Sequence, residues 1–280
     1  MKTTLFADDA CLSFGHDSPQ YIENHVNLEL EKVRKWMNNN KLSLNINKTN
    51  FVLFHKKKQP VNISITYNGN KLVRKNEIKY LGVFIDQKLN FSSHINYCLK
   101  KLNKCIWAIC KLRKYTTPKT LKLLYYSIAY PFLQYCVSTW GGTAKSLLKP
   151  LLTKQKIIAR LILNQPYRSP SSPLFHALKI LKLDDIYQLQ ICRLMHKHHR
   201  ENIVVSHGLT NLSDLHSHNT RSHQNNNYYL PAVRTNLGKT SFSFNGPKIW
   251  NALPPEIRNF SNYGFKDKLK NYFIGNYSRI

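Results

Sequence analysis

The spacing of apolar residues predicts β-hairpins near the start of the chain and amphipathic helices over most of the rest. Residues 2–7 and 11–14 are apolar runs that are predicted to pair as a hairpin, with Asp8-Asp9 at its turn. An isolated two-stranded hairpin is marginally stable in water. We therefore expect a further strand from upstream, which this chain does not contain, to pair with it.

Residues 18–40 are predicted to form a helix, because apolar side chains recur there at every third or fourth position. Ser18-Pro19 supplies an N-cap and a first-turn proline. The apolar stripe consists of Ile22, Val26, Leu30, Val33 and Met37.

Apolar and β-branched runs predict further strands at residues 51–54, 62–67, 71–73 and 79–85. Asn68-Gly69 is the preferred pair for a type I′ turn, so the second and third of these runs are expected to form a hairpin around it. Gly82 lies inside the last run, where it indicates either a β-bulge or a close approach of the backbone to a ligand.

From Ser92 onward the apolar spacing becomes helical. The first stripe consists of Ile95, Leu99, Leu102, Ile106 and Ile109. Thr117-Pro118 begins a second helix, predicted to kink at Pro131. Its predicted apolar face consists of Leu121, Leu124, Tyr125, Ile128, Phe132 and Tyr135. A third helix is predicted at residues 146–163.

The last part of the chain has weaker patterns. Residues 164–183 are predicted to be a proline-rich connector, followed by a helix at 184–200 whose histidine-rich end is interpreted as a polar helix end rather than a metal site. Residues 205–235 are predicted to be mostly loop. Alternation at 241–244 predicts a short strand, Trp250 is expected to anchor a small core, and a final basic helix contains Lys266, Lys268 and Lys270.

Residues 123–144 carry no charge over 22 positions, a length that could span a membrane. The stretch also contains tyrosines, Pro131 and Gly141-Gly142. We therefore favour a buried helix and keep a membrane-associated segment as the alternative.

The balance of charge indicates a polyanionic partner. Lys and Arg number 42 against 14 Asp and Glu, a formal net charge of +28, which favours nucleic acid first and an anionic membrane surface second. A merely soluble basic protein is the alternative. The six cysteines form no Cys-x-x-Cys pair and are interpreted as reduced thiols, and the only early apolar run is interrupted by Asp8 and Asp9. We expect an intracellular protein, in the cytoplasm, the nucleus or both.

The paired carboxylates of Asp8 and Asp9 are the candidate chemistry. Adjacent aspartates after an apolar run repel each other unless a cation lies between them and a partner. Mg²⁺ is held by one or two carboxylates together with substrate phosphates. An acidic turn between two strands is the alternative interpretation.

Phe6-Ala7-Asp8-Asp9 resembles the catalytic hairpin, motif C, of reverse transcriptases from non-LTR, jockey-like retrotransposons. Leu42-Ser43-Leu44-Asn45 through Lys48-Thr49 resembles motif D, and Tyr80-Leu81-Gly82 resembles motif E, the primer grip. The resemblance implies that Asp8 and Asp9 are metal ligands, that Lys48 protonates the pyrophosphate leaving group, and that Tyr80, Leu81 and Gly82 hold the primer end.

The three basic helices resemble a polymerase thumb, which implies salt-sensitive contacts between nucleic-acid phosphates and Lys101, Lys104, Lys111 and Arg113. Residues 234–257 resemble the C-terminal ending of jockey-like polymerases. The implied fold is α+β. The resemblance implies a partial right-hand palm of antiparallel hairpins plus a helix at residues 1–90, a mainly α-helical thumb at 91–165, and a small C-terminal region at 166–280.

The resemblance also implies parts that the chain does not encode: a third carboxylate (motif A), the nucleotide-gripping motif B and the fingers. Mg²⁺ or Mn²⁺ is therefore expected only with a full palm. The implied partners are an RNA template, a DNA primer and, in an intact polymerase, dNTP, with no membrane; the oligomeric state is left open. The first hypothesis is a polymerase fragment that is inactive alone. The second is a non-catalytic nucleic-acid-binding remnant, and the third is a membrane-associated protein that uses 123–144.

Overall fold

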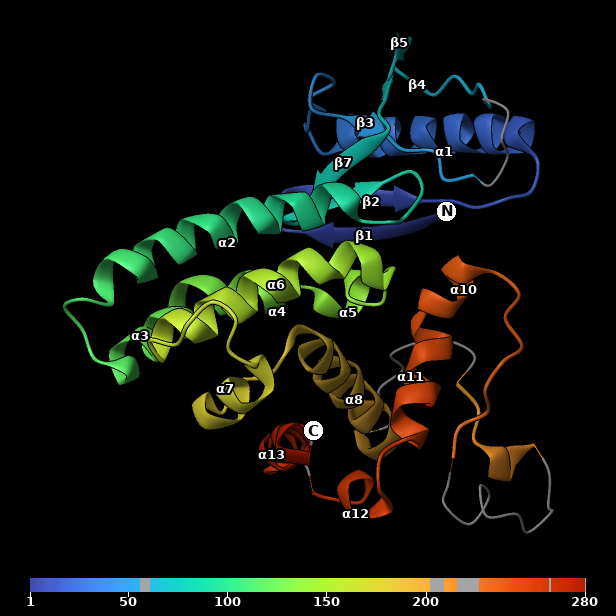
Figure 1. Cartoon of the computed structure of the whole chain (residues 1–280). Helices are drawn as coiled ribbons and strands as arrows, with labels where there is room; N and C mark the ends of the chain where they lie inside the picture. The colour runs from blue at the N-terminus through green and yellow to red at the C-terminus, as the bar shows by residue number, and fades with distance from the viewer. Residues whose placement is uncertain (56–60, 202–208, 216–226, 262, 280) are drawn as a thin grey trace. The chain divides into compact units, whose positions relative to one another are not determined.

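The computed structural model describes residues 1–55, 61–201, 209–215, 227–261 and 263–279. The protein is a mixture of helices and small sheets, which agrees with the predicted α+β class. It divides into two compact units, Met1–Leu89 and Asn90–Ile280, whose elements are labelled in Figure 1. Residues 91–165 and 166–280 both lie in the second unit.

The strands of the first unit pair two by two. The pairs are β1 (Lys2–Phe6) with β2 (Asp9–Ser13), β3 (Asn50–Phe51) with β6 (Val73–Arg74), β4 (Thr66–Tyr67) with β5 (Asn70–Lys71), and β7 (Glu77–Tyr80) with β8 (Val83–Asp86). All are antiparallel except β3 with β6, which is parallel. The strand predicted at 51–54 is wrong beyond Phe51, because only Asn50 and Phe51 have ladder partners.

Two turns of the first unit have positive φ at both central residues. Asn68 (φ 50°) and Gly69 (φ 74°) join β4 to β5, which confirms the predicted type I′ turn. The strands predicted at 62–67 and 71–73 are too long, because only Thr66–Tyr67 and Asn70–Lys71 pair across this turn and Val73 pairs with β3 instead. Leu81 (φ 43°) and Gly82 (φ 83°) join β7 to β8 in the same way. The single strand predicted at 79–85 is therefore wrong: the chain reverses at Gly82, where positive φ costs no steric strain.

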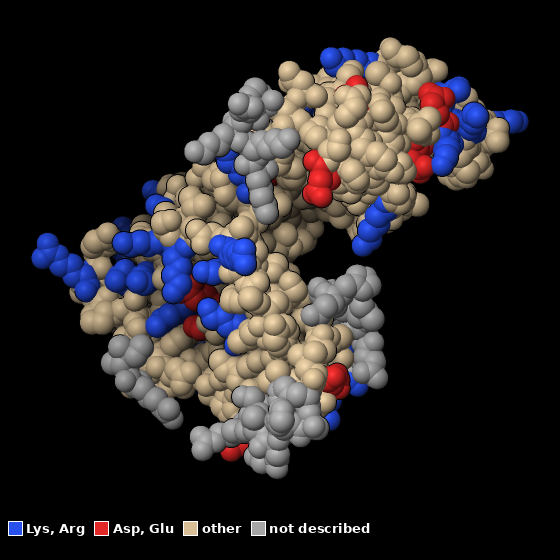
Figure 2. Space-filling model, turned by 90° about the vertical axis from the view of Figure 1, so that its right-hand side faces the viewer, with Lys and Arg blue, Asp and Glu red and all other residues tan. Residues whose placement is uncertain are grey.

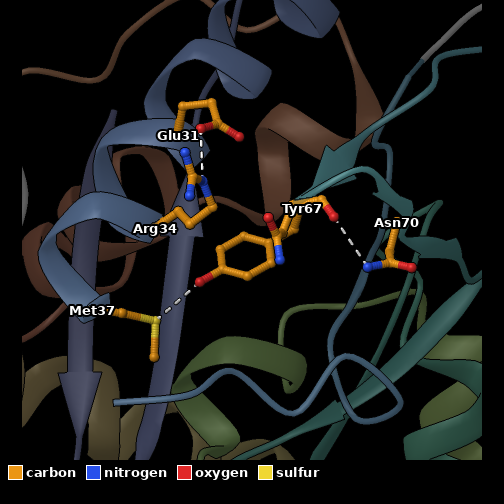
Figure 3. Close-up of polar contacts among 6 residues, drawn as sticks. Glu31, Arg34, Met37, Tyr67 and Asn70 are labelled. Carbon is orange, nitrogen blue, oxygen red and sulfur yellow. Dashed lines mark hydrogen bonds and ion pairs between the residues drawn. The ribbon is translucent and has the colours of Figure 1, made fainter. Parts of the chain in front are cut away.

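Helix α1 (Pro19–Asn39) has the predicted cap, since Ser18 Oγ accepts from the N–H of Tyr21 at 3.4 Å. Its buried Leu30 packs in a small core with Ile65, Tyr67 and Leu72. The Tyr67 hydroxyl also donates to Met37 Sδ at 3.5 Å, so the ring bridges the helix and the β4–β5 hairpin (Figure 3).

Asn27 fixes the edge of that hairpin to the helix. Its Nδ2 donates to the Ser64 carbonyl at 3.0 Å, and its Oδ1 accepts from the N–H of Thr66 at 2.9 Å. The side chain thus satisfies backbone groups that would otherwise need a partner from a neighbouring strand.

In the second unit, helices α2 (Ser92–Leu112) and α6 (Lys145–Ile162) pack against each other. Ile95, Leu102 and Ile109 of the predicted stripe are buried, and Leu99 and Ile106 lie at its margins. On α6 the buried residues include Leu151, Ile158 and Ile162. Both helices agree with the prediction.

The second predicted helix is divided by a π-helical turn. Helix α3 (Pro118–Leu124) continues into π-helical Tyr125–Ala129, then α4 (Tyr130–Gln134) and α5 (Val137–Trp140). Pro131 has no N–H to give and its ring crowds the preceding turn, which accounts for the irregularity just before it. The wider turn shifts the helix phase, so Ala129 and Leu133 are buried where Ile128 and Phe132 were predicted.

Residues 123–144 therefore contribute to a protein core. Leu133, Val137 and Trp140 are almost fully buried in it. Among the described residues, no helix is both long enough and apolar enough to cross a bilayer.

Within the described residues, the other helices are α7 (Ser171–Leu178), α8 (Leu183–Glu201), α10 (Asn236–Thr240), α11 (Phe242–Asn251), α12 (Pro255–Arg258) and α13 (Phe265–Gly275), with 3₁₀ turns at Leu212–Asp214 and Asn276–Arg279. The connector predicted at 164–183 is wrong in part, because α7 buries Phe175 and Leu178. The strand predicted at 241–244 is also wrong, since this segment begins α11, which packs on α8. Trp250 is buried, as predicted. Of the loop predicted at 205–235, residues 205–208 and 216–226 lie outside the described residues. The described part is mostly irregular, as predicted, with the 3₁₀ turn and an isolated bridge between Asn211 and Tyr228.

Candidate nucleic-acid interface and acidic hairpin

The aspartate pair lies at the tip of the β1–β2 hairpin. Ala7 (φ 51°) and Asp8 form the two-residue turn, and Asp9 is already in β2, paired with Phe6. The prediction that both aspartates lie in the turn is thus correct only for Asp8. Both carboxylates are exposed.

The hairpin presents apolar residues to solvent. Leu5 is 70% and Phe6 is 62% exposed, and in the described sheets β1 pairs with β2 alone. An open edge with exposed apolar side chains is what a strand shows when it lacks a neighbour.

The described residues bring no third acidic ligand to Asp8 and Asp9. Within them there is no group of three or more His, Cys, Asp or Glu side chains that could hold a metal ion. Mg²⁺ requires near-octahedral oxygen coordination and is held weakly by few ligands. The two aspartates therefore do not by themselves fit a magnesium site.

Lys48 lies in an exposed turn, where its N–H bonds to the Asn45 carbonyl at 3.2 Å. The turn is held by Leu44 and Ile46, which pack against the same small core as α1. In the part of the chain that the structure describes, no hydrogen bond or ion pair joins Lys48 to Asp8 or Asp9.

The three residues of the motif E resemblance lie at the β7–β8 turn. Tyr80 pairs with Val83 across the hairpin, and Tyr80 and Leu81 are partly buried. Gly82 is exposed with φ 83°, so its backbone is open to close approach by a ligand.

The outer face of α2 and the turn that follows it carry a basic stripe, which we define as Lys100, Lys104, Trp107, Lys111 and Lys114. The first four are separated by four, three and four positions, which places them on one side of α2, and Lys114 lies in the turn directly after the helix. All five are exposed, Trp107 to 66%. Lys111 Nζ lies 6.0 Å from the centroid of the Trp107 ring.

Two of the four predicted phosphate-binding residues, Lys104 and Lys111, belong to this basic stripe. Lys101 does not, because it is partly buried with its Nζ 5.3 Å from the centroid of the Tyr97 ring. Arg113 follows α2 and, with Lys114, lines a cavity of about 330 Å³. Sequence reasoning overlooked Trp107, although an aromatic residue at helical spacing among lysines signals it.

Two histidines near the end of α8, His196 and His199, contact other residues of the second unit. His196 is buried, stacks on Phe265 at 3.9 Å between ring centroids, and bonds the Phe260 carbonyl through Nε2 at 2.9 Å. His199 Nδ1 lies 3.2 Å from the Tyr228 hydroxyl, and burial lowers its pKa. The interpretation as a polar helix end is therefore wrong for His196.

Most cations of the chain have no acidic counterpart. If each of the 14 Asp and Glu paired with one of the 42 Lys and Arg, 28 basic side chains would still be unpaired. On the face shown in Figure 2, Lys and Arg gather in clusters while Asp and Glu are sparse. Such a surface attracts polyanions.

Comparison with known proteins connects these features to one class of enzyme. The chain is 28% identical over 191 residues to a probable RNA-directed DNA polymerase from transposon X-element of Drosophila melanogaster, a match that covers 64% of this chain and 20% of that relative. It is 26% identical over 187 residues, 65% of this chain and 20% of the relative, to the RNA-directed DNA polymerase from mobile element jockey of the same species.

The corresponding jockey polymerase of Drosophila funebris is 28% identical over 125 residues, 43% of this chain and 14% of the relative. The matches thus span a fifth or less of these curated relatives. No protein-family model matches the chain, and no solved structure matches it. The relatives indicate a reverse-transcriptase-related function.

Proposed function

We propose that this chain is the C-terminal part of a jockey-like, non-LTR retrotransposon RNA-directed DNA polymerase and that it binds the RNA template and DNA primer. The observation that carries the binding is the basic stripe of α2. It presents three lysines and an exposed tryptophan on one face of the helix, with Lys114 in the turn that follows, and no acidic residue interrupts it.

A row of lysines on a helix binds phosphates without reading sequence, and binding weakens as salt replaces the released counterions. Trp107 adds an apolar ring that can contact sugars or bases. Template and primer change in sequence as synthesis proceeds, so sequence-independent contact suits a polymerase.

Catalysis requires more than the described residues supply. Asp8 and Asp9 would hold Mg²⁺ or Mn²⁺ together with a carboxylate from another segment. The open edge of β1 and the exposed Leu5 and Phe6 support a further strand beside this hairpin. Lys48 and the Tyr80–Gly82 turn are proposed to act on the leaving group and the primer end, respectively, and dNTP would bind only in the completed site.

Primer extension with Mg²⁺ or Mn²⁺ separates a working polymerase from a non-catalytic nucleic-acid-binding remnant. We expect no incorporation by the 280-residue chain alone. Incorporation that disappears in Asp8→Ala would refute that expectation and would make the chain a polymerase in its own right.

Binding is tested by replacing two stripe lysines, Lys104→Glu with Lys111→Glu, and titrating an RNA–DNA duplex at several salt concentrations. Each lost phosphate contact should weaken binding and reduce the salt slope by about 1. The control, Lys2→Glu with Lys35→Glu, removes the same net charge from exposed positions in the first unit. Equal losses in both double variants would show that only net charge matters and would count against the stripe.

A further inference from the structure

A cavity of about 450 Å³ opens between α4, α5 and α8 of the second unit, mostly within the helical region that resembles a polymerase thumb and outside the stretches that resemble motifs C, D and E. Its lining includes the aromatic rings of Tyr126, Tyr130 and Tyr135 and the amides of Gln134 and Gln190. None of the described residues that line it is acidic. The volume falls in the range of small-ligand pockets, about 300–1,000 Å³.

The backbone around this cavity departs twice from regular helix. Tyr125–Ala129 is π-helical, and Cys136 has φ 49° and ψ 25°, the left-handed region that a residue with a Cβ enters at a cost. Single π-helical turns and strained residues recur at functional sites. Both departures lie in the segment that forms the cavity wall.

Cations lie beside the tyrosines. Lys270 Nζ is 5.7 Å from the centroid of the Tyr126 ring, and Arg193 Nη1 donates to Gln190 Oε1 at 3.3 Å. Burial lowers the pKa of Lys270, and the neighbouring positive charge of Lys122 lowers it further. An anion beside these groups would relieve that repulsion.

The phenols are neutral at physiological pH. Burial raises the pKa of Tyr126 to about 12. Burial also raises the pKa of Tyr130, although the Arg193 charge opposes the shift. Neutral tyrosines offer aromatic faces without repelling a phosphate, although the Tyr126 hydroxyl already donates to the Lys179 carbonyl at 3.4 Å.

We propose that this cavity binds one unpaired nucleobase of a single-stranded nucleic acid. The base stacks on the tyrosines, its edge bonds to the amides of Gln134 and Gln190, and the flanking phosphates lie near Lys270 and Arg193. Stacking on aromatic side chains accepts any base, and amide side chains bond base edges. The proposal rests on the proposed nucleic-acid binding and adds a preference for single strands, because a duplex keeps its bases stacked inside.

The test uses the full chain with a labelled single-stranded oligonucleotide and its blunt-ended duplex, each as RNA and as DNA. Tyr135 is 51% exposed, so Tyr135→Leu should fold. We expect this variant to weaken single-strand binding by about tenfold, the loss of one stacked base, and to leave duplex binding unchanged. The matched control is Tyr263→Leu, at a position that is 94% exposed and does not line the cavity, and it should change neither.

A second variant, Gln134→Leu with Gln190→Leu, keeps the tyrosines but removes the amides. It should reduce the differences in affinity among single-stranded homopolymers of different bases. Thermal unfolding by circular dichroism verifies that each variant folds. If the wild-type chain binds neither single strand nor duplex, the proposed function fails and this site fails with it. If it binds both and Tyr135→Leu weakens them equally or not at all, only the nucleobase site is overturned.

Discussion

Replacement of the Gln155 side chain should strongly destabilise the second unit. Gln155 is 1% exposed, and its amide makes three buried hydrogen bonds. Nε2 donates to the Tyr125 hydroxyl at 2.9 Å and to the Leu181 carbonyl at 2.7 Å, and Oε1 accepts from the N–H of Leu183 at 3.0 Å. One side chain thus joins α6 to the π-helical turn and to the start of α8.

Gln155→Met keeps most of the volume but removes all three bonds. The Tyr125 hydroxyl, the Leu181 carbonyl and the Leu183 N–H then stay buried without a partner. Each unsatisfied group costs about 1–3 kcal/mol. Relaxation of the surrounding side chains and entry of water reduce the summed cost of the three groups. We therefore expect the free energy of unfolding to fall by about 3–6 kcal/mol. That is a large share of the roughly 5–15 kcal/mol by which a folded domain is stable.

The assay is urea unfolding followed by far-ultraviolet circular dichroism, with the wild-type chain and Gln155→Met compared at neutral pH. The matched control is Gln165→Met, because Gln165 is exposed and its side chain bonds only the nearby Leu163 carbonyl, at 3.3 Å. An exposed substitution of this kind should change stability by less than about 0.5 kcal/mol. A loss below about 1 kcal/mol in Gln155→Met would refute the assignment of Gln155 as a buried junction.

Three other side chains give further predictions. Burial lowers the pKa of His94, so below about pH 6.5 the unfolded chain binds a proton that the folded chain does not. The free energy of unfolding should therefore decrease as the pH is lowered from neutral, and His94→Gln should reduce that decrease in urea titrations between neutral and mildly acidic pH. Asn27→Ala removes two hydrogen bonds to the backbone of the β4–β5 hairpin and should cost about 1–3 kcal/mol, visible as faster amide exchange at Thr66 with Asn24→Ala, at an exposed position on α1, as control. Trp250→Ala empties a fully buried site and should cost about 3–5 kcal/mol in chemical unfolding, and an unchanged midpoint would contradict its role as a core anchor.

Elements with strong local signals could be predicted from the sequence. Helices α1, α2, α6 and α8 have apolar residues at helical spacing, and Ser18-Pro19 marks the start of the first. Asn68-Gly69 predicted its turn because few residue pairs tolerate positive φ twice. In each case the determining interactions lie within a few residues of one another.

The secondary-structure predictions that are wrong, at residues 79–85 and 241–244, have a common physical cause. The apolar run at 79–85 is compatible with one strand or with a hairpin, and only the folded chain shows the reversal at Leu81-Gly82. The alternation at 241–244 is compatible with a strand, yet packing of α11 on α8 and burial of Trp250 favour a helix. Short patterns of this kind are decided by the surface on which they pack.

The hairpin that presents the aspartate pair, the large positive charge and the helix that carries the basic stripe could all be predicted from the sequence. These follow from residue types and from spacing along the chain. Three further features became visible in the folded chain: Trp107 lies exposed among the stripe lysines, Gln155 joins α6 to Tyr125 and to the start of α8, and one cavity is lined by Tyr126, Tyr135 and Gln190. The reason is that burial, and contact between residues distant in sequence, depend on how the helices pack. That packing cannot be predicted from the spacing of residues along the chain.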